Sequence, residues 1–220
     1  MSKRFWNGLL VVAVMAGLAP RASAQRSTGT AAATRTAEQG APDYRGGLVS
    51  PPLPRPRFTL VDTSGAPFDF QARTQGKLTL LFFGYTHCPD MCPMQMSVIA
   101  QALRKLPAGV ADRVTVVFAT TDPERDTPPV VRTWLDHFDR RFIGLTGTQS
   151  AVVAAQVASQ LPPARKSPVR PDGSYDVGHA AFALAYTRDN LAHVIYPVGV
   201  SVDDLAHDLA LLVAQDWPHQ

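Results

Sequence analysis

Two cysteines, Cys88 and Cys92, stand four positions apart in the loop Cys-Pro-Asp-Met-Cys-Pro, and the chain has no other cysteine. Cysteine thiolates bind soft metal ions and attack disulfides, so the pair could hold a metal or act as a redox dithiol. A disulfide across so short a loop would stabilise the fold only weakly, because the gain grows with loop length. The spacing therefore indicates chemistry, and by itself it leaves metal binding and disulfide formation both open.

The segments on either side of the cysteines would place them at the start of a helix. Residues 78–83 form an almost continuous apolar run, which is typical of a strand buried on both faces, and residues 94–106 have apolar residues at helical spacing. Backbone N–H groups and the helix dipole at such a junction stabilise thiolates. This position favours either use of the pair.

The rest of the chain alternates strands and helices. Strand patterns occur at 58–62, 114–119, 142–145, 181–186 and 193–196, and helix patterns at 128–138, 148–159 and 205–213. A further apolar segment at 68–70 pairs with the first strand as a predicted hairpin. We therefore predict an α/β fold with a central mixed sheet, helices on both faces and an N-terminal hairpin.

The first 24 residues have the layout of a secretory signal peptide. Lys3 and Arg4 precede an apolar stretch of about 15 residues, and Ala22-Ser23-Ala24 is a small-residue cleavage site. The stretch is shorter than the roughly 20 residues that span a bilayer. We expect an exported, periplasmic protein; the alternative is an uncleaved segment that anchors it to the inner membrane, facing the periplasm.

Residues 25–56 are rich in Pro, Ala and Thr without a regular period, so we predict a flexible tether before a folded domain at 57–215. The formal net charge of +3 comes from the signal segment. Without Lys3, Arg4 and Arg21, the 21 basic residues become 18 and equal the 18 acidic ones. A formally neutral mature chain gives no reason to expect nucleic acid binding.

The donor types narrow the choice of metal. Two thiolates with an imidazole form a soft site that suits Cu(I) and tolerates Cu(II) or Zn(II). A closed structural zinc site usually takes four Cys and His ligands, but this chain has two Cys, and its six His lack zinc-finger spacing. Copper is the better fit.

Four sequence blocks resemble the Sco (SenC) family of copper-binding assembly factors. Residues 83–93 (FGYTHCPDMCP) resemble its cysteine signature, 121–127 (TDPERDT) its second block and 142–147 (FIGLTG) a third. His179 stands before an apolar strand, where the family has a histidine ligand. The resemblance implies a thioredoxin-like fold that holds copper, as Cu(I) or Cu(II), through Cys88, Cys92 and His179.

The resemblance also implies a metallochaperone that helps deliver copper to the dinuclear copper centre of cytochrome c oxidase. Its partners would be subunit II of that enzyme, or another cuproprotein, and a periplasmic copper donor. Two alternatives use the same dithiol: a thiol-disulfide oxidoreductase acting on the oxidase's cysteines, with Cys88 and Cys92 as catalytic residues, and a copper- or redox-sensing protein. Whether the chain is an enzyme stays open.

One residue departs from the family pattern. An Asp directly before the ligand histidine is expected in many relatives, and this chain has Gly178 there. Partners around a metal ligand orient it and tune its basicity. The missing carboxylate therefore bears on the orientation and charge of His179.

Overall fold

Eight strands form the central sheet of the computed structural model, which describes residues 43–217. In chain order they are β1 (Gly47–Pro54), β2 (Thr59–Asp62), β3 (Pro67–Asp69), β4 (Leu78–Gly84), β5 (Val114–Thr120), β6 (Ile143–Thr146), β9 (Phe182–Tyr186) and β10 (Leu191–Pro197). Two short strands, β7 (Arg165–Lys166) and β8 (Val177–Gly178), pair separately. The helices are α1 (Phe70–Thr74), α2 (Met91–Lys105), α3 (Ala108–Ala111), α4 (Pro128–Asp136), α5 (Gln149–Ala158) and α6 (Val202–Ala214).

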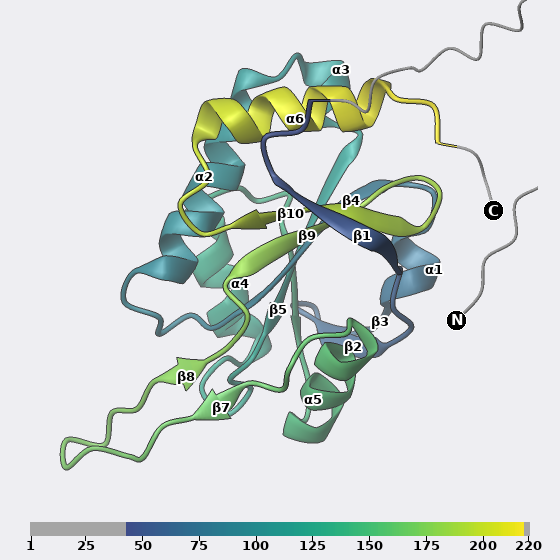
Figure 1. Cartoon of the computed structure of the whole chain (residues 1–220). Coiled ribbons are helices and arrows are strands. Elements are labelled where there is room, and N and C mark those ends of the chain that lie inside the picture. Colours follow the sequence, from purple (N-terminus) through teal and green to yellow (C-terminus); the bar gives the residue numbers. More distant parts are fainter. Residues whose placement is uncertain (1–42, 218–220) are drawn as a thin grey trace, which may run out of the picture. The chain divides into compact units, whose positions relative to one another are not determined.

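The order of strands across the sheet is β1-β10-β9-β4-β5-β6-β2-β3 (Figure 1). β4, β5 and β6 run parallel, and the other neighbouring pairs are antiparallel. β2 and β3 are the predicted N-terminal hairpin. The α/β fold class with a mixed sheet is confirmed.

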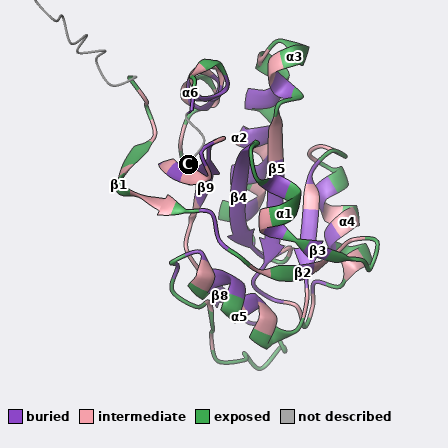
Figure 2. Cartoon of the chain, turned by 90° about the vertical axis from the view of Figure 1, so that its right-hand side faces the viewer, coloured by how far each residue is buried: buried purple, intermediate pink, exposed green. Residues whose placement is uncertain are grey.

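β4 lies at the middle of the sheet and is buried along its whole length (Figure 2). Leu80 and Phe82 belong to one apolar core, which they share with buried residues of α2, α4 and α6. Leu81 and Phe83 belong to the other core, which includes buried residues of α1 and α5. Because strand side chains alternate, one continuous apolar run serves both faces.

The predicted tether does not extend to residue 56. Its last part is β1, which pairs with the edge of β10, and the next residue, Arg55, is only 4% exposed. The Arg55 guanidinium donates to Thr74 Oγ1 and to the carbonyl of Thr187, each at 2.9 Å. An edge strand tolerates proline, so composition alone did not reveal it. Residues 25–42 of the predicted tether and the predicted signal peptide lie outside the described residues.

None of the helices within residues 43–217 is both long enough and apolar enough to cross a membrane.

The folded part begins by residue 45, whose backbone N–H already contacts Asp208 of α6. The domain therefore starts about a dozen residues before the predicted boundary at 57.

Candidate metal centre

Both cysteines lie where β4 gives way to α2. β4 ends at Gly84 and α2 begins at Met91, so Cys92 is the second residue of the helix and Cys88 lies in the preceding loop. The helix starts three residues before the predicted position, because Pro93 in a first turn needs no hydrogen-bond partner for its nitrogen. Cys88 is 8% exposed and Cys92 is fully buried.

The start of α2 offers a backbone donor to the first cysteine. The N–H of Cys92 donates to Sγ of Cys88 at 3.3 Å. Asp90, the N-cap residue, makes no capping hydrogen bond to any described residue. Donors at a helix start favour negative charge on sulfur. Both cysteines are free thiols, so the loop presents an unlinked dithiol at a helix N-terminus.

His179 reaches the cysteines from a distant segment, between β8 and β9. Its Nε2 lies 3.4 Å from Sγ of Cys92, and its Nδ1 lies 2.9 Å from the carbonyl oxygen of Ala180. Because a carbonyl only accepts, Nδ1 carries the hydrogen and Nε2 turns its lone pair toward the sulfur. The imidazole is thus oriented as a ligand nitrogen would be.

Burial sets the charge of these groups. It raises the pKa of the Cys92 thiol far above its ordinary value, and the neighbouring Cys88 sulfur adds to the effect. Burial also lowers the pKa of His179, partly offset by the hydrogen bond to Ala180. Cys92 is therefore a neutral thiol and His179 beside it a neutral imidazole. The imidazole nitrogen is available to a metal without losing a proton.

Two aromatic rings hold His179 edge-on. The ring centres of Phe82 and Tyr85 lie 6.0 and 5.8 Å from that of the imidazole, with interplanar angles of 81° and 88°. Both residues come from the end of β4 and the loop after it. The histidine therefore packs against the same segment that carries the cysteines.

A charged loop, residues 121–126, lies beside the site and carries the second family block. Asp126 is fully buried and accepts hydrogen bonds from the backbone N–H and the hydroxyl of Thr86. Asp122 is 4% exposed and accepts the hydroxyl proton of Tyr175 at 3.0 Å. The sequence pattern indicated a charged loop but did not predict that Asp122 and Asp126 are buried. The available signal was an Asp beside a Thr, twice, directly after a buried strand.

The predicted ligands are neighbours, but they do not yet form a closed site. Cys92 contacts both Cys88 and His179. Within residues 43–217, however, no three His, Cys, Asp or Glu side chains converge closely enough to hold a metal ion as they stand. A three-ligand site needs the Cys88 sulfur as well, and this sulfur now accepts a hydrogen bond from the Cys92 N–H.

The remaining described histidines bond elsewhere. His137 lies 3.2 Å from the carbonyl of Trp134, His193 contacts Asp189 and His207 contacts Asp208. These three imidazoles make structural contacts away from the cysteines.

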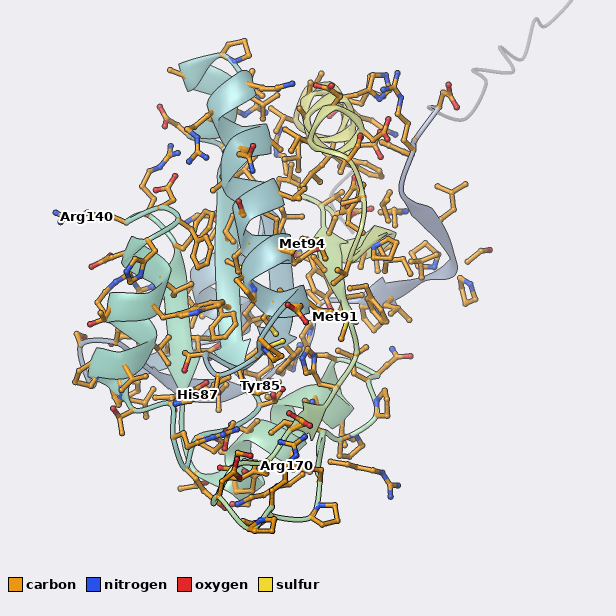
Figure 3. All side chains as sticks on the ribbon, turned by 90° about the vertical axis from the view of Figure 1, so that its left-hand side faces the viewer. Tyr85, His87, Met91, Met94, Arg140 and Arg170 are labelled. Carbon is orange, nitrogen blue, oxygen red and sulfur yellow. The ribbon has the colours of Figure 1, made fainter. Side chains whose placement is uncertain are left out.

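The surface around the cysteines carries a second group of donors. His87, which directly precedes Cys88, has a half-exposed side chain in the loop. Met91 and Met94 on α2 are each 45% exposed and lie on the same side of the molecule (Figure 3). Sulfur and imidazole groups thus surround the buried pair without entering it.

A sequence model of the SCO1/SenC family matches residues 50–214. The chain belongs to the SCO1/SenC family. A Stutzerimonas stutzeri protein whose name calls it copper-binding is 37% identical over 134 residues, which cover 58% of this chain and 63% of that protein. The chain covers between 47 and 63% of the length of the first curated relatives that it matches.

Two solved SCO1/SenC structures show the same fold. ScoI of Bradyrhizobium japonicum, solved with copper bound, is 33% identical with a TM-score of 0.65, covering 73% of this chain and 99% of that one. Apo Sco1 of Thermus thermophilus is also 33% identical, with a TM-score of 0.69, covering 77% and 96%. The predicted family and thioredoxin-like fold are confirmed.

Gly178 lies in β8 with open space around it. A Cβ built there would meet only the carbonyl oxygen of Arg165, at 3.8 Å. The missing carboxylate is therefore not excluded by packing. The carbonyl of Ala180 occupies the Nδ1 side of the neighbouring histidine instead.

Proposed function

We propose that this protein binds copper through Cys88, Cys92 and His179 and acts as a metallochaperone for the dinuclear copper centre of cytochrome c oxidase. The observation that carries the proposal is the 3.4 Å contact between Cys92 Sγ and His179 Nε2, which joins segments 87 residues apart. A cysteine sulfur and an imidazole nitrogen are both donors that copper prefers, so this contact supplies two of the three proposed ligands.

The donor set fits copper. Cys92 and His179 are already in contact, the imidazole is neutral, and its tautomer leaves Nε2 free. The third donor, Cys88 Sγ, lies 3.3 Å from the backbone nitrogen of Cys92. When bound, copper lowers the pKa of the coordinating thiols and so displaces their protons.

Membership of the SCO1/SenC family supports a direction of transfer. We propose subunit II of the oxidase, or another cuproprotein, as the recipient and a periplasmic copper donor as the source. The N-terminal apolar segment supports export to the periplasm, with retention at the inner membrane as the alternative. The exposed Met91 and Met94 beside the dithiol support docking of a second copper-binding protein there.

A second function, thiol-disulfide exchange with the recipient's cysteines, is favoured by the hydrogen bond from the Cys92 N–H to Cys88 Sγ. That bond reaches the sulfur of the more accessible cysteine, and accessibility is what attack on a partner's disulfide requires. His179 has no part in such an exchange. The two functions therefore differ in what they need from the histidine.

A transfer experiment separates them. Copper-loaded protein is mixed with the reduced, metal-free copper domain of subunit II, and the absorption of the dinuclear centre is followed. We expect the centre to form while this chain loses copper. The oxidoreductase reading gains if no copper moves but the reduced, copper-free protein reduces a disulfide in the recipient.

A further inference from the structure

His179 lies at the base of a projecting arm, residues 165–178. The arm is a long hairpin held together by β7 and β8, which pair over only two residues each, and it extends beyond the sheet (Figure 1). After the histidine, the chain enters β9 and the central sheet. On the N-terminal side of His179, the position of the chain depends on the contacts that the arm makes with the rest of the domain.

Two residues of the arm, Val177 and Tyr175, are buried in the core of the domain. The polar contacts with the charged loop centre on Tyr175. This residue is 9% exposed, and its hydroxyl donates to Asp122 at 3.0 Å. The guanidinium of Arg125 lies 3.6 Å from the ring centre, and the Arg125 side chain also pairs with Asp122. One ring is thus fixed by a hydrogen bond and a cation–π contact from the same loop.

A second pair joins the arm to the same loop. Lys166 of β7 forms an ion pair with Glu124 at 2.7 Å, and its Nζ lies 3.8 Å from the ring centre of Tyr175. The arm therefore meets the charged loop through Lys166 of β7 and through Tyr175, which precedes β8. The partly buried contact of Tyr175 is the stronger one, because the exposed ion pair is screened by solvent.

The charged loop also holds the cysteine side of the site. Asp126 accepts two hydrogen bonds from Thr86, two residues before Cys88. The backbone N–H of Thr121 donates to the carbonyl of Gly84, at the end of β4, at 2.6 Å. Both halves of the metal centre are therefore attached to residues 121–126.

We infer that the charged loop sets the separation of Cys92 and His179, with Arg125 and Tyr175 as positioning residues for the histidine. The inference rests on the proposed copper function. The imidazole's own hydrogen bond goes to the adjacent Ala180 and cannot fix its distance from the sulfur. That distance depends on the packing of Phe82 and Tyr85 against the imidazole and on where the arm is held.

The two oxidation states of copper respond differently to a displaced arm. Two thiolates satisfy Cu(I), whereas Cu(II) gains more from an added imidazole. Arg125→Ala and Tyr175→Phe should each weaken Cu(II) binding by about 10-fold, the effect typical of residues that orient a metal ligand. Cu(I) binding should stay unchanged.

Arg170→Ala is the matched control. Arg170 lies on the same arm (Figure 3) and pairs with Asp176 of that arm. Its loss should leave both copper affinities at their wild-type values. In the His179→Ala background, Arg125→Ala should have no further effect on Cu(II), because a positioning residue acts only through the residue that it positions.

A copper-free measurement keeps this inference separate from the copper function. In the metal-free protein, nuclear Overhauser effects between the His179 and Tyr85 rings should weaken in Arg125→Ala and Tyr175→Phe but persist in Arg170→Ala. Wild-type contacts in both folded variants would overturn the positioning role. Lost contacts in a protein whose wild type binds no copper would leave that role standing and contradict the proposed function.

Discussion

Asp126 holds Thr86 by two hydrogen bonds, at 2.9 Å from the backbone N–H and 2.6 Å from the hydroxyl. A third bond, from the hydroxyl of Thr120 at 2.6 Å, completes the shell of this buried carboxylate. The conformation of the cysteine loop thus depends on a residue 40 positions further along the chain.

Asp126→Asn should lower the free energy of unfolding by about 1–3 kcal/mol, because the amide nitrogen cannot accept the protons that the carboxylate oxygen accepts. Urea denaturation measures this. Asp112→Asn is the control: its side chain is 68% exposed, 3.4 Å from Arg141, and its loss should not be measurable. Equal stabilities of the two variants would contradict the role of Asp126.

Gly84, the last residue of β4, lies next to Cys92, and there is no room for a side chain at this position. A Cβ would come within 2.8 Å of the Phe82 ring and 3.1 Å of Cys92 Sγ. Gly84→Ala should therefore cost about 1–3 kcal/mol of stability.

Gly109, in α3, is the comparison for Gly84. A Cβ there meets nothing within 4 Å, so Gly109→Ala should stabilise the protein by about 0.5–1 kcal/mol through helix propensity. Thermal unfolding of the two variants gives shifts of opposite sign. Unfolding of Gly84→Ala at or above the wild-type temperature would contradict the lack of space for a side chain at Gly84.

Asp208 attaches the N-terminal segment to α6. Its buried carboxylate accepts the backbone N–H groups of Arg45 and Gly46 at 2.9–3.0 Å and the hydroxyl of Tyr196 at 3.2 Å. Asp208→Ala should release this segment and speed amide exchange in β1, because those donors lose their acceptor.

Asp203→Ala is the control for Asp208 on the same helix, since its side chain is 75% exposed. Hydrogen exchange measured by mass spectrometry should leave β1 protected in that variant. Protection of β1 unchanged in Asp208→Ala would show that the strand is held by pairing with β10 alone.

Gly178→Asp tests the departure from the family pattern. The open space at this position predicts a folded protein of unchanged stability. A carboxylate beside His179 should strengthen Cu(II) binding by about 10-fold, as partners that raise ligand basicity do. Competition with a chelator measures the change in Cu(II) affinity. Gly173→Asp is not a suitable control, because the backbone φ of Gly173 is +82°. Unaltered Cu(II) affinity in Gly178→Asp would mean that Ala180 already supplies what His179 needs.

The local elements of this fold could be predicted from the sequence because they follow from local periodicity. The apolar run at 78–83 became β4, and the helical spacing that follows became α2. A dithiol between them was therefore expected at a helix start, and Cys92 lies there. The reactivity of the dithiol could therefore be predicted from the types and spacing of the residues around it.

Contacts between distant segments could not be read in the same way. β1 looked like a tether because edge pairing with β10 leaves no periodic signal in a Pro-rich stretch. The hydrogen bonds of Asp126 and Tyr175 join residues 40 and 53 positions away. His179 was found through a family resemblance, since no local pattern places an imidazole beside a sulfur 87 residues earlier.

Copper titration of the reduced protein under anaerobic conditions, with His179→Ala and His137→Ala in parallel, tests the central claim most directly. We predict one copper per chain and a Cu(II) affinity lowered more than about 10-fold by His179→Ala. His137→Ala should behave as wild type, because its imidazole lies 3.2 Å from the carbonyl of Trp134. Wild-type copper affinity in folded His179→Ala would contradict a Cys88–Cys92–His179 site.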